Sequence, residues 1–145
     1  LRELAASIVS PWADPSRLKL VDSQPKAAIG KLLANLALAI SAEGMKEALL
    51  FGDATGLTAA ETLDMLDATG LSFMANLKRD FVLGDRSTDP GDFTVDALCK
   101  DSKLMLDTAG QVLPGIQAAV ESFTIQQDHG RGDHDFSAIL VHRSE

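Results

Sequence analysis

The chain has 145 residues, 46% of them hydrophobic and 23% charged, which is enough for one domain with a sizeable core and excludes a disordered polymer. Its formal net charge is −8 at pH 7, and an acidic surface repels nucleic-acid phosphates and anionic lipids, so we expect neither nucleic acid nor membrane as a partner. The single cysteine, Cys99, excludes an internal disulfide, and no signal peptide opens the chain. We therefore expect a cytoplasmic protein.

The first 24 residues have the pattern of the end of another domain. Residues 1–9 read as a short amphipathic helix that stops at Ser10-Pro11, and residues 17–21 alternate as a strand does. That strand has no partner elsewhere in the sequence, and an isolated strand is not stable. The chain also lacks an initiator methionine. We expect it to begin inside a longer protein or after processing.

A helical pattern without proline runs over residues 26–53, and its first half is apolar on nearly all sides. We expect this helix to be buried on most sides and to end with Gly56 as its C-cap. Polar side chains interrupt its apolar runs well before the 18 residues of a membrane span. Gly30, Gly44 and Gly52 lower its helix propensity, and two interpretations stay open: close backbone approach or tolerated kinks.

Shorter helices follow the long one. Thr58 and Glu61 have the spacing of a capping box, which opens a helix that extends to about residue 70. Asp133 or Asp135 is expected to cap the last helix of the chain. Further helical patterns run over residues 72–81, 94–109, 114–127 and 136–141. The sequence predicts an all-α fold with one very long buried helix and four or five shorter helices around it.

Lys31 and Asn35 are the polar side chains that stand out in the long helix. They are four residues apart and therefore lie on one helical face. A lysine in such a segment either packs its stem and extends its charge to solvent, or lines a cleft where a lowered pKa suits proton transfer. The spacing does not separate the two.

Four short motifs occur in order over residues 25–140. They are Lys31-Leu-Leu-Ala-Asn35, then Glu47-Ala-Leu with a later Gly56-Leu57, then Phe93 to Lys100-Asp101, and last Gly130 to Ala138. This order resembles the C-terminal domain of the β-hydroxyacid dehydrogenases, which include 3-hydroxyisobutyrate and tartronate semialdehyde dehydrogenases and are related to 6-phosphogluconate dehydrogenase. The resemblance implies a 6-phosphogluconate dehydrogenase C-terminal-domain-like bundle around the long helix. At the family's first asparagine after the lysine, this sequence has Ala34.

The resemblance also implies roles for single residues. Lys31 is implied to be the catalytic acid and base, which accepts the hydroxyl proton of a β-hydroxyacid and returns it in the reverse reaction. Asn35 is implied to hold the substrate's carboxylate or the lysine, and Phe93 to form a wall of the substrate pocket. Lys100 is implied to reach the nicotinamide cofactor, NAD or NADP. Asp101 points about 100° away from Lys100 on a helix, so we expect an orienting or structural group there.

The sequence lacks the Gly-x-Gly-x-x-Gly turn that binds a dinucleotide after a strand. Its Gly-x-Gly, Gly130 to Gly132, has no strand before it. We therefore assign residues 1–24 to the trailing helix and strand of a missing Rossmann domain, and residues 25–145 to the helical substrate-binding and dimerisation domain. The three histidines match no zinc spacing, and we expect no metal.

Two alternatives stay open. A non-catalytic helical dimerisation module would bury the apolar long helix against a second copy, with Lys31 solvated and replaceable. An imine-reductase-like oxidoreductase domain would share the fold, but such enzymes generally lack the lysine, so Lys31 favours a hydroxyacid substrate. The resemblance implies a homodimer through the helical domains, compatible with catalysis.

Overall fold

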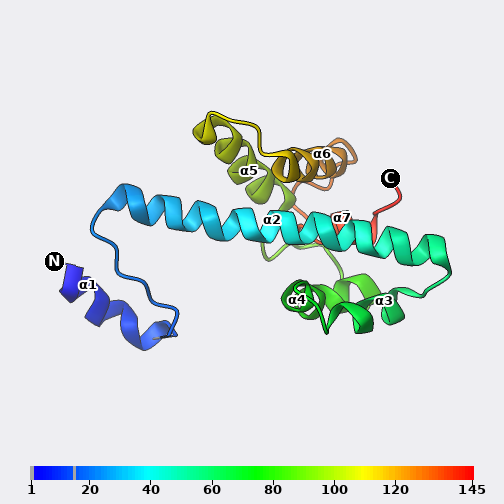
Figure 1. Cartoon of the computed structure of the whole chain (residues 1–145), viewed down its shortest axis with the longest axis horizontal. Coiled ribbons are helices and arrows are strands. Elements are labelled where there is room, and N and C mark those ends of the chain that lie inside the picture. Colours follow the sequence, from blue (N-terminus) through cyan, green and yellow to red (C-terminus); the bar gives the residue numbers. More distant parts are fainter. Residues whose placement is uncertain (1, 15) are drawn as a thin grey trace. The chain divides into compact units, whose positions relative to one another are not determined.

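The structure is a computed structural model that describes residues 2–14 and 16–145. These residues form seven α-helices and one 3₁₀ helix, with no strand among them. The elements are α1 (Arg2–Val9), η1 (Ser10–Trp12), α2 (Gln24–Thr55), α3 (Ala59–Leu66), α4 (Ser72–Leu83), α5 (Val95–Ala109), α6 (Pro114–Asp128) and α7 (Ala138–Val141) (Figure 1). The predicted all-α fold is confirmed.

The chain divides into two compact parts, Leu1–Lys31 and Leu32–Glu145. In the first part, α1 gives way to η1 at Ser10, as predicted. The strand predicted over residues 17–21 is wrong, because residues 16–17 form a turn and residues 18–21 are irregular. Its alternation is a local pattern, whereas a strand also needs a neighbour for its backbone groups, and the described residues contain no other strand.

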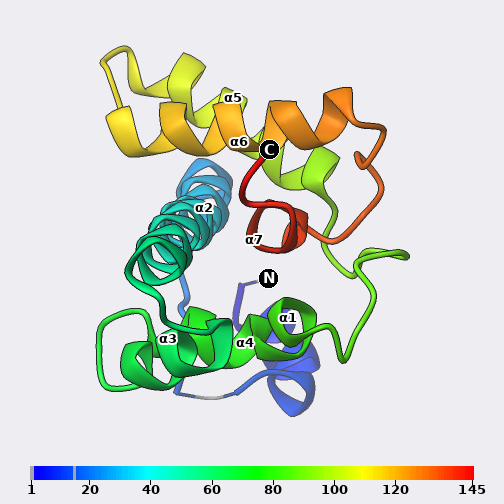
Figure 2. The ribbon, with the colours of Figure 1, turned by 90° about the vertical axis from the view of Figure 1, so that its right-hand side faces the viewer.

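The second part is layered around α2, here from residue 32 onward. Helices α5 and α6 pack together on one side of α2, α3 and α4 pack together on the other, and α7 lies beside α2 between the two pairs (Figures 1 and 2). Every layer contributes fully buried side chains to one core. They include Ala39, Met45, Leu49, Leu63, Leu98, Ile116, Phe123 and Ile139.

The buried residues of α2 lie on one face and begin at Ala39, halfway along the helix. Its buried residues are Ala39, Ala42, Met45, Leu49 and Gly52, which recur every three or four positions. This differs from the burial on most sides that its composition predicts. Among the described residues one helix, α2, is long and apolar enough to cross a membrane, because an 18-residue window in it has a mean hydropathy of 1.3. The polar side chains that interrupt its apolar runs therefore do not exclude a span by length and composition alone. That is weak evidence, because a core helix of a soluble protein passes the same test.

Gly52 brings α2 against α3. A Cβ placed on Gly52 would collide with Thr62 Oγ1 and would lie 3.3 Å from two further atoms of the Thr62 side chain. The same construction at Gly44 meets only Leu71 Cδ2, at 4.0 Å, and at Gly30 meets nothing within 4 Å. Of the two interpretations of these glycines, close approach therefore applies to Gly52.

The predicted caps around the α2–α3 turn are confirmed. Gly56 has a φ of +86°, a left-handed conformation that favours glycine, and follows the last residue of α2. Thr58 Oγ1 accepts a hydrogen bond from the Glu61 amide at 3.2 Å, and the Glu61 carboxylate accepts one from the Thr58 amide at 2.8 Å. This reciprocal pair satisfies two amides at the start of α3.

The last helix starts later than predicted. α7 begins at Ala138, and its N-cap residue, Ser137, makes no side-chain capping bond. Neither Asp133 nor Asp135 is the cap. Asp135 Oδ1 does accept a hydrogen bond from the Ser137 amide at 2.9 Å, but the same oxygen also meets a lysine, as described below.

Candidate functional site

A polar contact network joins α2 to α5. Asn35 Nδ2 donates a hydrogen bond to Asp101 Oδ2 at 2.7 Å, and Lys100 Nζ lies 3.4 Å from Asp101 Oδ1. Asp101 is only 4% exposed, whereas the Lys100 side chain is 73% exposed. The buried carboxylate therefore fixes the Asn35 amide, while the neighbouring ammonium extends toward solvent.

The helical register of α5 explains why Asp101 is buried and Lys100 is exposed. Thr94 starts the helix by accepting a hydrogen bond from the Ala97 amide at 3.2 Å. Asp101 then lies three residues after Leu98 and four before Met105, so it shares their buried face. Lys100 is rotated about 100° from that face. The geometry agrees with the expectation that Asp101 orients its neighbours.

Phe93 is held in a second network just before α5. Its amide lies 3.4 Å from Asp135 Oδ2, and its carbonyl accepts a hydrogen bond from the Phe136 amide at 2.9 Å. The Phe93 and Phe136 rings meet edge to face, with centroids 6.0 Å apart and an interplanar angle of 78°. The Phe93 side chain is half-buried. It is thus an aromatic ring that its neighbours hold in place and that is partly exposed.

Lys31 belongs to α2 in the first part of the chain, and its side chain is exposed. Exposure of a lysine side chain is compatible with a solvated charge and with a place in a cleft, and by itself does not distinguish the two. The catalytic role of Lys31 stays a prediction, as do the binding roles of Asn35, Phe93 and Lys100.

Lys78 of α4 and Asp135 form an ion pair in which both residues are buried, at 5% and 0% exposed. Lys78 Nζ donates to Asp135 Oδ1 at 2.7 Å and lies 4.0 Å from the centroid of the Phe136 ring and 4.8 Å from that of Phe81. Burial raises the pKa of Asp135, but hydrogen bonds from Lys78 and from the Ser137 amide outweigh it and hold that pKa below its ordinary value. Asp135 is therefore a buried, ionised carboxylate.

Sequence reasoning missed Lys78, and it considered Asp135 as a helix cap, as part of the tail motif and, with the histidines, as a metal ligand that the spacing did not support. A signal for Lys78 was present, since Met74, Ala75 and Phe81 flank it at spacings of three and four, and all three are buried. Lys78, like Lys31, is a lysine among apolar residues of a helix.

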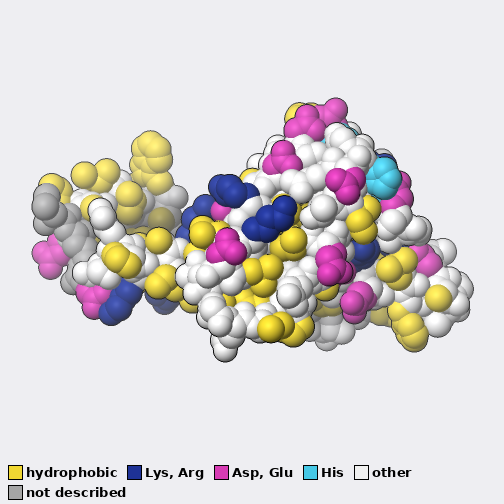
Figure 3. Space-filling model, turned by 90° about the horizontal axis from the view of Figure 1, so that it is seen from above, with side chains coloured by type: hydrophobic (Ala, Val, Ile, Leu, Met, Phe, Trp, Pro, Cys, Tyr) yellow, Lys and Arg dark blue, Asp and Glu magenta, His cyan; other side chains and the backbone are white. Residues whose placement is uncertain are grey.

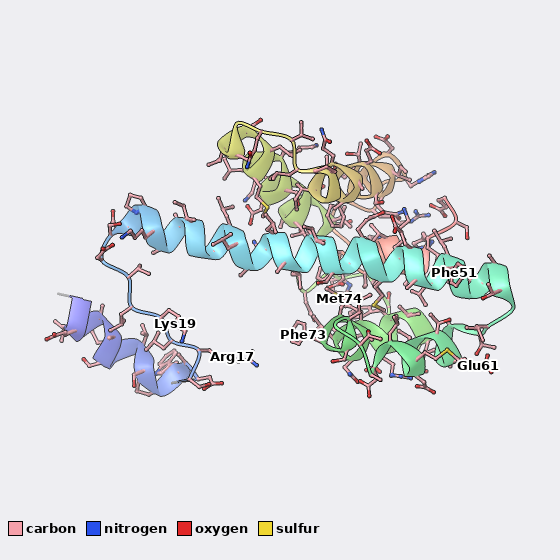
Figure 4. The ribbon with its side chains drawn as sticks, in the orientation of Figure 1. Arg17, Lys19, Phe51, Glu61, Phe73 and Met74 are labelled. Atoms are coloured by element: carbon pink, nitrogen blue, oxygen red, sulfur yellow. The ribbon has the colours of Figure 1, made fainter. Side chains whose placement is uncertain are left out.

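A small apolar hollow of about 120 Å³ opens between α2 and α4. It is lined by Ala34, Ala37, Leu38, Ser41, Phe73 and Met74, the last two at the start of α4 (Figure 4). Sites for drug-sized ligands have about 300–1,000 Å³, so this hollow is too small for a dinucleotide. Asn35 is not among the residues that line it, and its amide is engaged with α5.

The glycine-rich tail does not fit the pyrophosphate of a dinucleotide. A Cβ on Gly132 would lie 2.5 Å from Asp96 Oδ1, and the Gly132 carbonyl accepts a hydrogen bond from the Asp96 amide at 2.9 Å. A carboxylate packed against the loop repels phosphate. Acidic side chains are also spread over the face shown in Figure 3, in keeping with the net charge of −8.

Comparison with known protein families assigns the chain to one of them. The family described as "NAD-binding of NADP-dependent 3-hydroxyisobutyrate dehydrogenase" matches residues 26–142, which is most of the sequence. The chain belongs to this family, and thus to a group of NAD(P)-linked oxidoreductases. The resemblance drawn from the four motifs is confirmed.

Solved structures support the same fold. The 3-hydroxyisobutyrate dehydrogenase of Mycobacterium tuberculosis, in a structure with L-serine, matches with a TM-score of 0.61 and 20% sequence identity. The match covers 81% of this chain and 43% of that protein, so the chain spans less than half of its relative's length. No curated protein matches the sequence.

Proposed function

We propose that this chain is the catalytic and dimerisation domain of an NAD(P)-dependent β-hydroxyacid dehydrogenase, which interconverts a 3-hydroxyacid and its semialdehyde. The family match over residues 26–142 carries the proposal. The contact between Asn35 and Asp101 supports it, because it fixes an amide four residues after Lys31 in the sequence.

Lys31 is the proton-transfer group in this proposal. It accepts the hydroxyl proton during oxidation and donates a proton to the same oxygen during reduction. Its ammonium form also stabilises negative charge on that oxygen, and does so more strongly where water is excluded. The bound nicotinamide supplies the hydride chemistry, and the residues of this chain handle the proton and the substrate.

Asn35 holds the substrate's carboxylate. An amide nitrogen carries two hydrogens, and one of them is directed at Asp101 Oδ2, which leaves the other for a carboxylate. The exposed part of the Phe93 ring forms a wall of the substrate pocket. The exposed Lys100 side chain contacts a cofactor that is held mainly by a domain outside this sequence.

The partners in this proposal are an N-terminal Rossmann domain and a second copy of the chain. Large apolar side chains are exposed on α2 and α4, among them Leu33 at 59% and Phe73 at 62%. Exposed apolar surface of this kind is typical of interaction sites. Light scattering of the full-length protein should give twice the mass of one chain, and a monomer at all concentrations would contradict the dimer.

A non-catalytic dimerisation module is the second candidate, and the exposed apolar side chains of α2 and α4 favour it. The two are separated by following NAD(P)H absorbance with the full-length protein, a panel of 3-hydroxyacids and semialdehydes, and cyclic imines. Turnover of a hydroxyacid supports the dehydrogenase, and turnover of imines alone would indicate an imine reductase. If none of these compounds is turned over with NAD or NADP, the module is the better account.

A further inference from the structure

We propose that the buried pair of Lys78 and Asp135 positions Phe93, and that both charged residues thereby set the affinity for substrate without touching it. This inference rests on the proposed function, in which Phe93 bounds the substrate pocket.

The Asp135 carboxylate connects the two residues directly. Its Oδ1 accepts hydrogen bonds from Lys78 Nζ at 2.7 Å and from the Ser137 amide at 2.9 Å. Its Oδ2 faces the Phe93 amide at 3.4 Å. Because Lys78 and Ser137 fix one oxygen, the other is held in place opposite Phe93.

Phe136 supplies a second connection. Its amide donates to the Phe93 carbonyl at 2.9 Å, and its ring packs edge to face on the Phe93 ring. Lys78 Nζ lies over that same Phe136 ring, 4.0 Å from the centroid. One ammonium group therefore contacts both of the residues that hold Phe93.

Phe93 ends a loop that fits closely against the segment before α7. Asp135 donates its amide to the Thr88 carbonyl at 2.7 Å, and the Val95 amide donates to the His134 carbonyl at 2.9 Å. A Cβ on Gly91 would lie 2.5 Å from the Asp135 nitrogen, so the two backbones are in direct contact. The loop is therefore placed by polar contacts around Asp135, and only to a lesser extent by burial of the half-exposed Phe93 ring.

A purely structural role does not account for the pair well. Well-packed apolar residues often stabilise a fold as much as a buried ion pair does, because desolvation of both charges offsets their attraction. What an apolar pair cannot supply is a fixed oxygen for the Phe93 amide. The ion pair is thus suited to specifying a position.

The test uses the full-length protein with Lys78→Met and, as a control matched for lost core packing, Leu63→Ala, since Leu63 is fully buried in α3. Hydrogen exchange at the Phe93 amide and the steady-state constants are measured for each. Lys78→Met should raise both the exchange rate and the KM for the hydroxyacid about tenfold, with kcat within about twofold. Leu63→Ala should leave the exchange at Phe93 and the KM within about twofold of the unaltered protein.

If Lys78→Met does not fold, the double variant Lys78→Met/Asp135→Leu is used, because it leaves no unpaired buried charge. It also lacks the oxygen opposite the Phe93 amide, so its exchange rate at Phe93 and its KM should both rise. Unchanged exchange at Phe93, an unchanged KM, or an equal rise of both in Leu63→Ala would overturn the proposal. Absence of turnover in the unaltered protein would instead overturn the proposed function, while the exchange rates would still decide whether the pair positions Phe93.

Discussion

Gly52→Ala tests the close approach of α2 and α3. An alanine in a helix interior is favoured over glycine by about 1 kcal/mol. At Gly52, however, the new methyl group would collide with Thr62 Oγ1. The Thr62 hydroxyl donates to the Thr58 carbonyl at 3.1 Å, and a β-branched side chain has few other rotamers in a helix, so it cannot readily turn away.

These two effects together determine whether Gly52→Ala stabilises or destabilises the fold. Forcing a methyl group into a packed contact costs about 1–3 kcal/mol, which exceeds the propensity gain, so we expect a net loss of about 1 kcal/mol. Gly44→Ala is the matched control in the same helix, because its nearest neighbour would lie 4.0 Å away. That variant should gain up to about 1 kcal/mol. The two alanines should therefore change stability in opposite directions.

Urea unfolding followed by circular dichroism measures both variants. Repeating Gly52→Ala in a Thr62→Ala background should turn the loss into a gain, because the colliding hydroxyl is gone, with a coupling energy of about 2 kcal/mol. If Gly52→Ala stabilises the unaltered chain as much as Gly44→Ala does, or if Thr62→Ala makes no difference, the reasoning from close approach is refuted.

Three further predictions concern other contacts. Thr58→Ala should cost about 1 kcal/mol in the same unfolding assay, because it removes the capping bond to the Glu61 amide, and no measurable loss would contradict the role of the cap. Asp135 has a lowered pKa, so its contribution to stability is present above the ordinary value of 3.8 and is lost as pH falls through the lower folded-state pKa. Stability measured between about pH 5 and pH 2 should fall less in Lys78→Met/Asp135→Leu than in the unaltered protein, and an equal fall would be evidence against this. Asn35→Ala should raise the KM for the hydroxyacid about tenfold, whereas Asn76→Ala, an exposed asparagine of α4, should not; equal effects would argue against a substrate contact at Asn35.

Local patterns predicted most of the helices and their ends. The α2–α3 turn followed from Gly56 and from the Thr58–Glu61 spacing, because these signals act within a few residues. The prediction of a strand over residues 17–21 was wrong because a strand is stable only beside a partner strand. A pattern within a few residues does not show whether such a partner exists. Burial of α2 was overestimated because apolar composition does not say which face meets other helices.

The candidate site depended on contacts between distant residues. Asn35 and Asp101 are 66 residues apart, and Lys78 and Asp135 are 57 apart. Asn35 and Asp101 belong to two motifs of one family pattern, but the resemblance implied no contact between them. No motif drew attention to Lys78, and only the packing of α4 against the segment before α7 revealed its partner.

The central claim is that Lys31 transfers the proton. The most direct test is the turnover number of the full-length protein, followed by NAD(P)H absorbance, for Lys31→Met and for Lys26→Met as a control. Lys26 lies in the same helix and pairs with Asp22 at an exposed position. The account predicts that Lys31→Met lowers turnover about 10²–10⁴-fold with the helical content intact, while Lys26→Met leaves it unchanged. Turnover by Lys31→Met equal to that of the unaltered protein would contradict it, and Lys31 would then have no part in proton transfer.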